Sequence, residues 1–144
     1  MEQSRKKLKT YSIIVLIFTV ATIFNLLSVL IELNNATIPE DAPSNILLIT
    51  RIILIAVSSI LLLPQIYIGV KGLKIAKKPN SSKAHIVVAT ILFVFSILGV
   101  LSPITSLFQK QAVVENIRAI IYLVVEMSVY FDYIKWAKNV AKGK

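Results

Sequence analysis

The sequence predicts an all-α integral membrane protein, a bundle of four transmembrane helices with both termini in the cytoplasm. Hydrophobic residues make up 56% of the 144 residues, and the mean hydropathy is +0.79; soluble domains use roughly 45–50% apolar residues. These residues gather in four runs, each at or above the roughly 20 residues that a helix needs to cross about 30 Å of hydrocarbon. Barrel strands would need only about 9–11 residues and an alternating pattern.

The four runs indicate a single membrane domain that covers residues 1–144. The spans are expected at about 11–33, 46–70, 84–107 and 114–135, with a basic cytoplasmic loop at 71–83. A basic stretch precedes the first run, as in a signal peptide. That run exceeds the roughly 7–15 residues of a signal-peptide core, so it is expected to be retained as a span.

The distribution of positive charge predicts the orientation. The N-terminal segment before residue 11, the segment 71–83 and the tail from Lys135 carry four, five and four of the 16 Lys and Arg residues. Because Lys and Arg are retained on the cytoplasmic side, both termini and the middle loop are expected in the cytoplasm. The expected location is a cell (plasma) membrane, and the Ile- and Lys-rich composition without Cys is typical of a low-GC bacterium.

The fourth span is the least hydrophobic of the four and carries several charged residues: Glu115, Arg118, Glu126 and Asp132. Glu126 lies deepest, nine residues before Lys135, which is roughly 13 Å at 1.5 Å per residue. An ionisable group at that depth is costly, so Glu126 is the leading candidate for a functional residue.

Four other residues complete the candidate intramembrane polar site. Tyr122 is one turn from Glu126 on the same helix face, and Asn25 lies on a polar face of the first span. Gln65 lies at a depth comparable to that of Glu126 and can donate to its carboxyl group. Pro64 frees a backbone carbonyl one turn back, which is a second partner for a protonated Glu126.

Each span carries a polar or small-residue stripe, and the bundle is expected to hide these stripes from lipid. Nearer the outer face, Arg51 and Arg118 are expected to meet Glu32 and Glu115. At the inner end, Asp132 is expected to pair with Lys135, three residues later.

Three roles for Glu126 stay open at this point. The carboxyl group can be a protonated, hydrogen-bonded tie between helices, a proton or cation site, or a contact to a partner protein's span.

The basic segment is a second candidate site, for anionic lipid headgroups. Lysines near a membrane surface attract such headgroups by about 1 kcal/mol each. The alternative is that these lysines only set the topology. The residues are Lys71, Lys74, Lys77, Lys78 and Lys83.

The composition argues against several classes of function. The absence of Cys excludes thiolate metal sites and cysteine nucleophiles, and a single His excludes a multi-histidine metal site. No phosphate-binding Gly-rich loop, Gly-x-Ser-x-Gly or His-Glu-x-x-His motif occurs. We therefore expect no enzymatic activity, no cofactor, no metal and no nucleic-acid partner.

Two short resemblances are visible. Pro64-Gln65 resembles the dipeptide of PQ-loop transporters, which are built on three-helix units, but the likeness covers two residues of a chain with four spans. A buried glutamate in a four-span chain is similar to small multidrug-resistance transporters, in which the glutamate lies in the first span. Neither resemblance carries a function over to this chain.

The expected function is that of a small interaction or accessory subunit, similar in type to bacteriocin immunity proteins, with a membrane-protein partner or a second copy. The alternative is a small proton- or cation-coupled transporter that uses Glu126. A dry, packed interior would favour the first function, and a water-filled path to Glu126 would favour the second.

Overall fold

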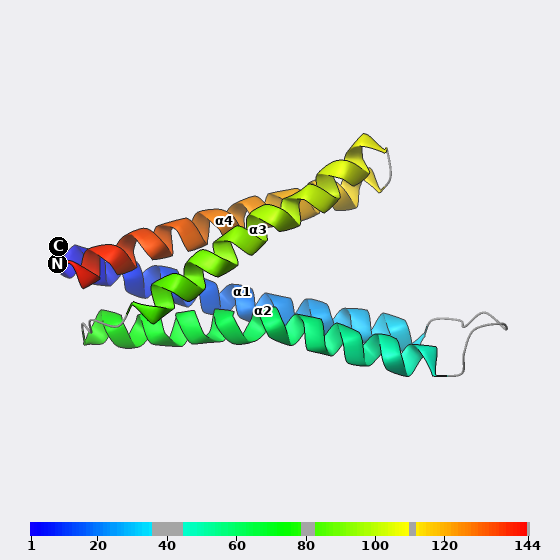
Figure 1. Cartoon of the computed structure of the whole chain (residues 1–144), viewed down its shortest axis with the longest axis horizontal. Coiled ribbons are helices and arrows are strands. Elements are labelled where there is room, and N and C mark those ends of the chain that lie inside the picture. The colour runs from blue at the N-terminus through cyan, green and yellow to red at the C-terminus, as the bar shows by residue number, and fades with distance from the viewer. Residues whose placement is uncertain (36–44, 79–82, 110–111, 144) are drawn as a thin grey trace.

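A computed structural model describes residues 1–35, 45–78, 83–109 and 112–143. The chain forms four helices in the order α1 (Glu2–Asn34), α2 (Ile46–Lys77), α3 (Ala84–Phe108) and α4 (Val113–Ala141) (Figure 1). The predicted outer loop after the first span lies mostly outside the described residues.

The prediction of an all-helical protein is confirmed for the described residues. Helices α1, α2 and α3 are each long and apolar enough to cross a membrane, whereas α4 is less apolar. The difference follows from the composition of α4, since its N-terminal half contains Glu115 and Arg118 and its middle contains Glu126.

Helix α2 continues into the segment that was expected to be a loop. Residues 71–77 of the predicted basic loop 71–83 are helical, and α2 ends only at Lys77. The continuation is favourable because it buries Ile75 and Ala76. In addition, Arg5 donates to the carbonyl oxygens of Ala76 and Lys77, which have no partner inside the helix. Residues 79–82 lie outside the described part of the chain.

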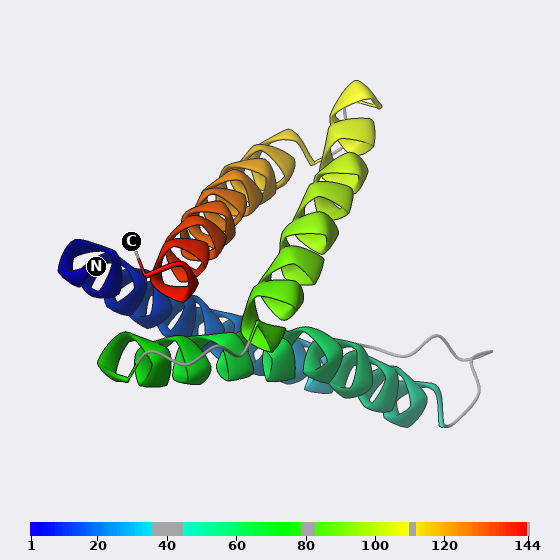
Figure 2. The same ribbon diagram turned by 60° about the vertical axis from the view of Figure 1, so that its left-hand side comes forward.

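The four helices form two hairpins that meet at one end only. Helix α1 packs along α2, and α3 packs along α4. The hairpins touch near the two chain termini and diverge toward the other end of the molecule, as two views show (Figures 1 and 2). The expectation of a closed bundle is therefore wrong for the far half.

The buried residues lie mainly at the end of the molecule where the two hairpins meet. The buried residues of α1 fall between Ser4 and Thr19, those of α2 between Gln65 and Ala76, and those of α4 between Glu126 and Val140. We call this part of the molecule the packed half and the remainder the diverging half. Polar residues of the diverging half that were expected inside a bundle are exposed: Asn25, Ser28 and Glu32.

Small residues allow α1 and α2 to approach closely in the packed half. A Cβ atom at Gly72 would collide with the Ser12 and Tyr133 side chains, and one at Gly69 would lie 2.6 Å from Leu16. Close backbone approach at small residues is a common way for membrane helices to pack.

Candidate functional site

Glu126 is the centre of a buried hydrogen-bonded layer. Its side chain is 7% exposed, and that of Gln65 is 4% exposed. Gln65 Nε2 donates to Glu126 Oε1 over 3.1 Å, and the Tyr130 hydroxyl donates to the same oxygen over 2.9 Å. Ser96 Oγ lies 3.2 Å from Glu126 Oε2. One carboxyl group thus connects α2, α3 and α4 where the hairpins begin to diverge.

The contacts of Ser96 bear on the chemistry of this layer. Its oxygen lies 3.2 Å from Glu126 Oε2 and also 3.1 Å from the Leu92 carbonyl oxygen. A serine hydroxyl has one hydrogen. When Glu126 is deprotonated, that hydrogen is shared between two acceptors; when Glu126 carries a proton on Oε2 and donates it to Ser96, each contact has its own hydrogen. The layer can therefore hold one proton on the carboxyl group.

Gln65 is the second polar member of the layer. Its amide nitrogen is used by Glu126, but its Oε1 atom is buried and has no hydrogen-bond partner among the described residues. The sequence placed Gln65 and Glu126 at similar depth with a direct contact, and the structure contains that contact.

Pro64 lies inside α2 directly before Gln65, and the helix runs through it from Ile46 to Lys77. The carbonyl that a proline leaves without its helical partner is four residues back, here that of Ile60. Within the described chain, Glu126 bonds to Gln65, Ser96 and Tyr130 and not to this carbonyl. The expected bond from Glu126 to the freed carbonyl is therefore not formed.

Asn25 and Tyr122 do not join Glu126. They line a separate pocket of about 490 Å³ between α1 and α4 in the diverging half. We call it the α1–α4 pocket, and its lining residues are Ala21, Thr22, Asn25, Glu115, Arg118, Ala119, Tyr122 and Leu123. The candidate site predicted from the sequence is thus divided between a buried layer and an open pocket.

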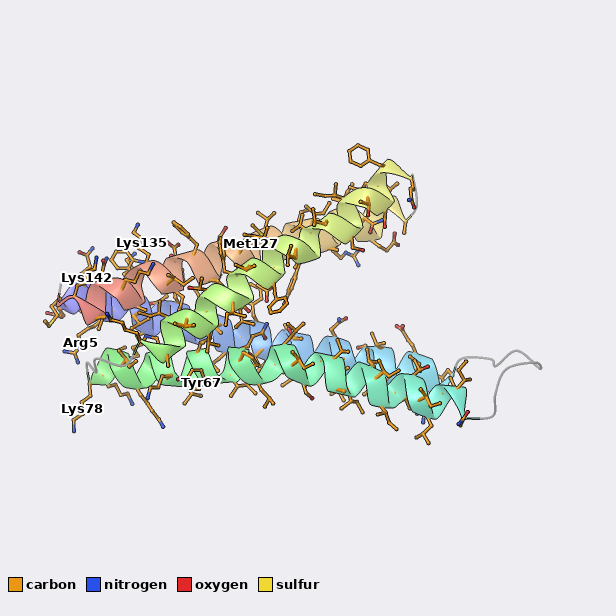
Figure 3. All side chains as sticks on the ribbon, viewed as in Figure 1. Arg5, Tyr67, Lys78, Met127, Lys135 and Lys142 are labelled. Atoms are coloured by element: carbon orange, nitrogen blue, oxygen red, sulfur yellow. The ribbon has the colours of Figure 1, made fainter. Side chains whose placement is uncertain are left out.

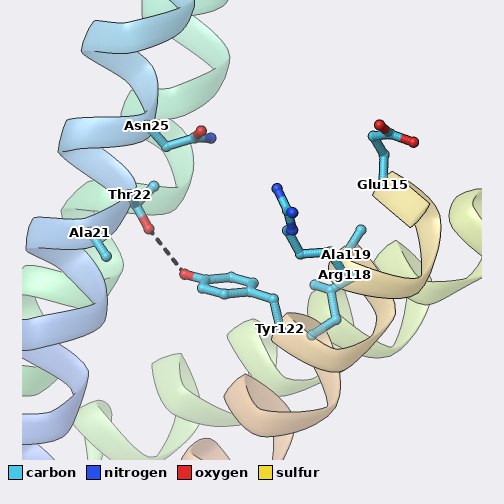
Figure 4. Close-up of a pocket in the computed structure, with 8 residues that line it drawn as sticks. Ala21, Thr22, Asn25, Glu115, Arg118, Ala119 and Tyr122 are labelled. Carbon is cyan, nitrogen blue, oxygen red and sulfur yellow. Dashed lines mark hydrogen bonds between the residues drawn. The ribbon is translucent and has the colours of Figure 1, made fainter. Parts of the chain in front are cut away.

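Tyr122 lines this pocket and extends from α4 toward α1. Its hydroxyl lies 3.4 Å from Thr22 Oγ1 across the space between the helices (Figure 4). Its ring meets Phe18 edge-on, with ring centroids 5.5 Å apart. Glu126 lies one turn further along α4 and does not line the pocket.

The charged residues of the pocket form no ion pair with any described residue. Arg118 points into the space between α1 and α4 toward Asn25, while the Glu115 carboxylate points away from α1 (Figure 4). No ion pair joins Arg118 to Glu115 or Arg51 to Glu32, since Lys6–Glu2, at 2.7 Å, is the only ion pair among the described residues. The two expected pairs are therefore wrong.

Two of these polar groups have other partners. Arg51 donates to Asn34 Oδ1 on α1. Asp132, which was expected to pair with Lys135, accepts a hydrogen bond of 2.7 Å from the Tyr11 hydroxyl. Both contacts join α1 to another helix, whereas the expected Asp132–Lys135 pair lay within one helix.

The five lysines proposed for lipid contact lie at the end of the molecule that holds both termini, where Figure 3 labels Lys78. The first four are at the end of α2: Lys71, Lys74, Lys77 and Lys78. Lys83 stands apart from these, directly before α3, and shares a pocket with Lys138 and Lys142 of α4.

Sequence reasoning did not assign Ser96 or Tyr130 to the Glu126 layer. Ser96 was recognised only as part of a small-residue stripe on the third span. Tyr130 follows Glu126 by four residues, a spacing that places both side chains on one helix face. This spacing was the signal that could have identified Tyr130.

Among the described residues, no group of three or more His, Asp or Glu side chains comes together in a way that could hold a metal ion. No protein-family model, curated protein or solved structure matches the chain.

Proposed function

We propose that this protein is a non-enzymatic interaction subunit of a bacterial plasma membrane, of the accessory or immunity type. All four helices span the membrane, and both termini are cytoplasmic. The observation that carries the proposal is the open α1–α4 pocket, where polar side chains from two helices face each other without a described helix between them.

The polarity of this pocket supports a protein occupant. Lipid tails cannot hydrogen-bond to the Asn25 amide, which has no hydrogen bond to another described residue, and burying such a group without a partner costs about 1–3 kcal/mol. A partner's transmembrane helix with its own polar side chains removes this cost. Arg118 has no described ion pair, so a carboxylate on the partner helix is the complementary group.

The Glu126 layer supports the same function. Its carboxyl group is buried and hydrogen-bonded to three side chains, as expected for a tie that joins the hairpins. Such a tie keeps the diverging half open at a defined angle to receive another helix.

Site-specific crosslinking can test this proposal, because the chain has no cysteine and a single introduced one is unique. A thiol-linked photocrosslinker at Ala119→Cys, inside the pocket, is expected to capture one partner of defined mass in native membranes. The matched control is Ile121→Cys, two residues away and 60% exposed outside the pocket; it is expected to capture none.

Three further results bear on the proposal. Adding Asn25→Leu and Arg118→Leu to the Ala119→Cys variant should abolish the crosslinked adduct if the partner binds through the polar groups of the pocket. Equal capture at Ala119 and Ile121 would contradict the proposal. So would rapid reaction of Ala119→Cys with a membrane-impermeant maleimide in intact cells, because the pocket would then be filled with water.

A small proton- or cation-coupled transporter is the second candidate. The supporting observation is that Tyr122 of the α1–α4 pocket lies one turn along α4 from the Glu126 carboxyl group, which can hold a proton. In addition, Gln65 Oε1 beside Glu126 lacks a described partner. Proteoliposomes with wild type and with Glu126→Gln should then differ in proton or cation flux. Equal flux, or none in either, would exclude this candidate.

A further inference from the structure

A basic pocket lies where α3 begins and α4 ends. It has a volume of about 430 Å³ and combines three lysines with apolar side chains. Its lining residues are Lys83, Ile86, Val87, Lys138, Ala141 and Lys142. No carboxylate of the described residues lines it, so the pocket is suited to an anion that also has an apolar part.

The positive charge of this pocket is not neutralised by the described chain. The three lysines form no ion pair there, since the one described pair joins Lys6 to Glu2. Lys83 also occupies the N-cap position of α3, and no side chain in the described part of the chain caps this helix. The N-terminal amide groups of a helix favour an anion, and a phosphate is a frequent ligand at such a position.

An apolar furrow continues directly from the basic pocket along α3. The two share Ile86 and Val87, and the furrow ends at Leu98. Its lining residues are Ile86, Val87, Thr90, Ile91, Val94, Phe95 and Leu98. Most of them are exposed, on the side of α3 away from the buried face that contains Ala89, Leu92 and Ser96.

The length of the furrow matches one leaflet of a bilayer. From Ile86 to Leu98 the helix rises by about 18 Å at 1.5 Å per residue. Half of a hydrocarbon core is about 15 Å thick. An acyl chain whose headgroup lies at the lysines would therefore cover the furrow from end to end.

We propose that this surface binds one anionic phospholipid in the leaflet next to the chain termini. The phosphate lies among Lys83, Lys138 and Lys142, and one acyl chain follows the furrow on α3. A zwitterionic lipid fits less well, because no carboxylate of the pocket pairs with a choline group. A soluble phosphate would leave the furrow unused. The inference requires that α3 spans the membrane and does not depend on what occupies the α1–α4 pocket.

Native mass spectrometry of the full chain in detergent can test the assignment with phosphatidylglycerol and phosphatidylcholine as probes. The wild type is expected to retain one phosphatidylglycerol in preference to phosphatidylcholine. Replacing Lys83, Lys138 and Lys142 together by Gln should weaken phosphatidylglycerol binding about hundredfold, from about 1 kcal/mol for each lysine near a headgroup.

A matched variant separates a defined site from general attraction. Replacing Lys6, Lys7 and Lys9 by Gln removes the same charge from exposed positions at the start of α1, and binding should change much less. The variant Thr90→Trp fills the furrow with all lysines intact and should also weaken binding. Circular dichroism and gel filtration verify that each variant is folded.

Three results would overturn the proposal. Equal loss in the two triple-lysine variants would show that the attraction is not localised. Equal retention of both lipids would show that charge plays no part. Displacement of the lipid by glycerol phosphate at concentrations similar to those of phosphatidylglycerol would show that the furrow contributes nothing.

Discussion

Glu126 connects three helices through two oxygen atoms. A charged acidic residue at the centre of a membrane helix costs about 2.5–3.5 kcal/mol on an insertion scale, and no described cation lies within ion-pair distance of this one. The dual contacts of Ser96 with Leu92 and Glu126 are satisfied together when the carboxyl group is protonated. The acid form therefore makes the layer both uncharged and fully hydrogen-bonded at the carboxyl group.

This geometry predicts a difference between two substitutions at Glu126. Gln can accept from Gln65 and Tyr130 through its oxygen and donate to Ser96 through its nitrogen, so Glu126→Gln should preserve stability. Glu126→Ala removes all three contacts and should lower the free energy of unfolding by about 1–3 kcal/mol, from roughly 0.6 kcal/mol or more for each hydrogen bond between membrane helices. Unfolding in mixed detergent micelles measures the free energy of unfolding of both variants.

A matched control is Glu115→Ala on the same helix, because Glu115 is exposed and unpaired among the described residues. It should change stability little. If Glu126→Gln were as destabilising as Glu126→Ala, the carboxyl group would not act as a protonated tie.

At the scale of helices, the close packing of α1 against α2 depends on the absence of side chains at Gly69 and Gly72. A Cβ atom at Gly72 would overlap Ser12 and Tyr133, whereas one at Gly99 would lie 3.6 Å from Leu123, an ordinary contact distance. Gly72→Ala should therefore destabilise the protein by about 1–3 kcal/mol, the usual cost of overpacking. Gly99→Ala should be neutral or stabilising, since Ala favours a helix over Gly.

Thermal unfolding in detergent can compare the two glycine variants directly. A loss of stability at Gly99 equal to that at Gly72 would show that the close approach at α1–α2 is not the cause.

Arg5 connects the beginning of α1 to the end of α2. It donates to the carbonyl oxygen of Ala76 over 2.8 Å and to that of Lys77. Arg5→Gln removes a cation from a helix C-terminus and should cost about 0.5–1.5 kcal/mol. Lys7→Gln removes the same charge from an exposed position without a described partner and is the control. Hydrogen exchange should show faster fraying of the last turn of α2 only for Arg5→Gln.

At the scale of the whole molecule, both termini lie at one end, next to the packed half (Figure 1). This arrangement agrees with an even number of crossings, and the distribution of lysines favours the cytoplasm for that end. Reporter enzymes fused to either end should therefore be active only as cytoplasmic fusions. An extracytoplasmic signal from a fusion at Lys144 would contradict the proposed orientation.

The helical fold could be predicted almost entirely from composition, because a long apolar run in a bilayer has few alternatives to a helix. Of the candidate site, the Gln65–Glu126 contact could also be predicted, since both depths follow from the fixed rise of a helix. The prediction that Arg51 and Arg118 form ion pairs with Glu32 and Glu115 was wrong for a different reason. Depth alone does not determine which helices are neighbours or how far apart they lie.

The sequence by itself determined the number of helices, their approximate limits and the depth of each polar residue, because these depend on hydrophobicity and on one-dimensional spacing. Only the tertiary structure decided that the helices pair as two hairpins that diverge. It thereby separated Asn25 and Tyr122 from Glu126 and placed Lys83 beside Lys138 and Lys142. The physical reason is that packing depends on side-chain shape between helices distant in sequence, such as Gly72 against Ser12 and Tyr133.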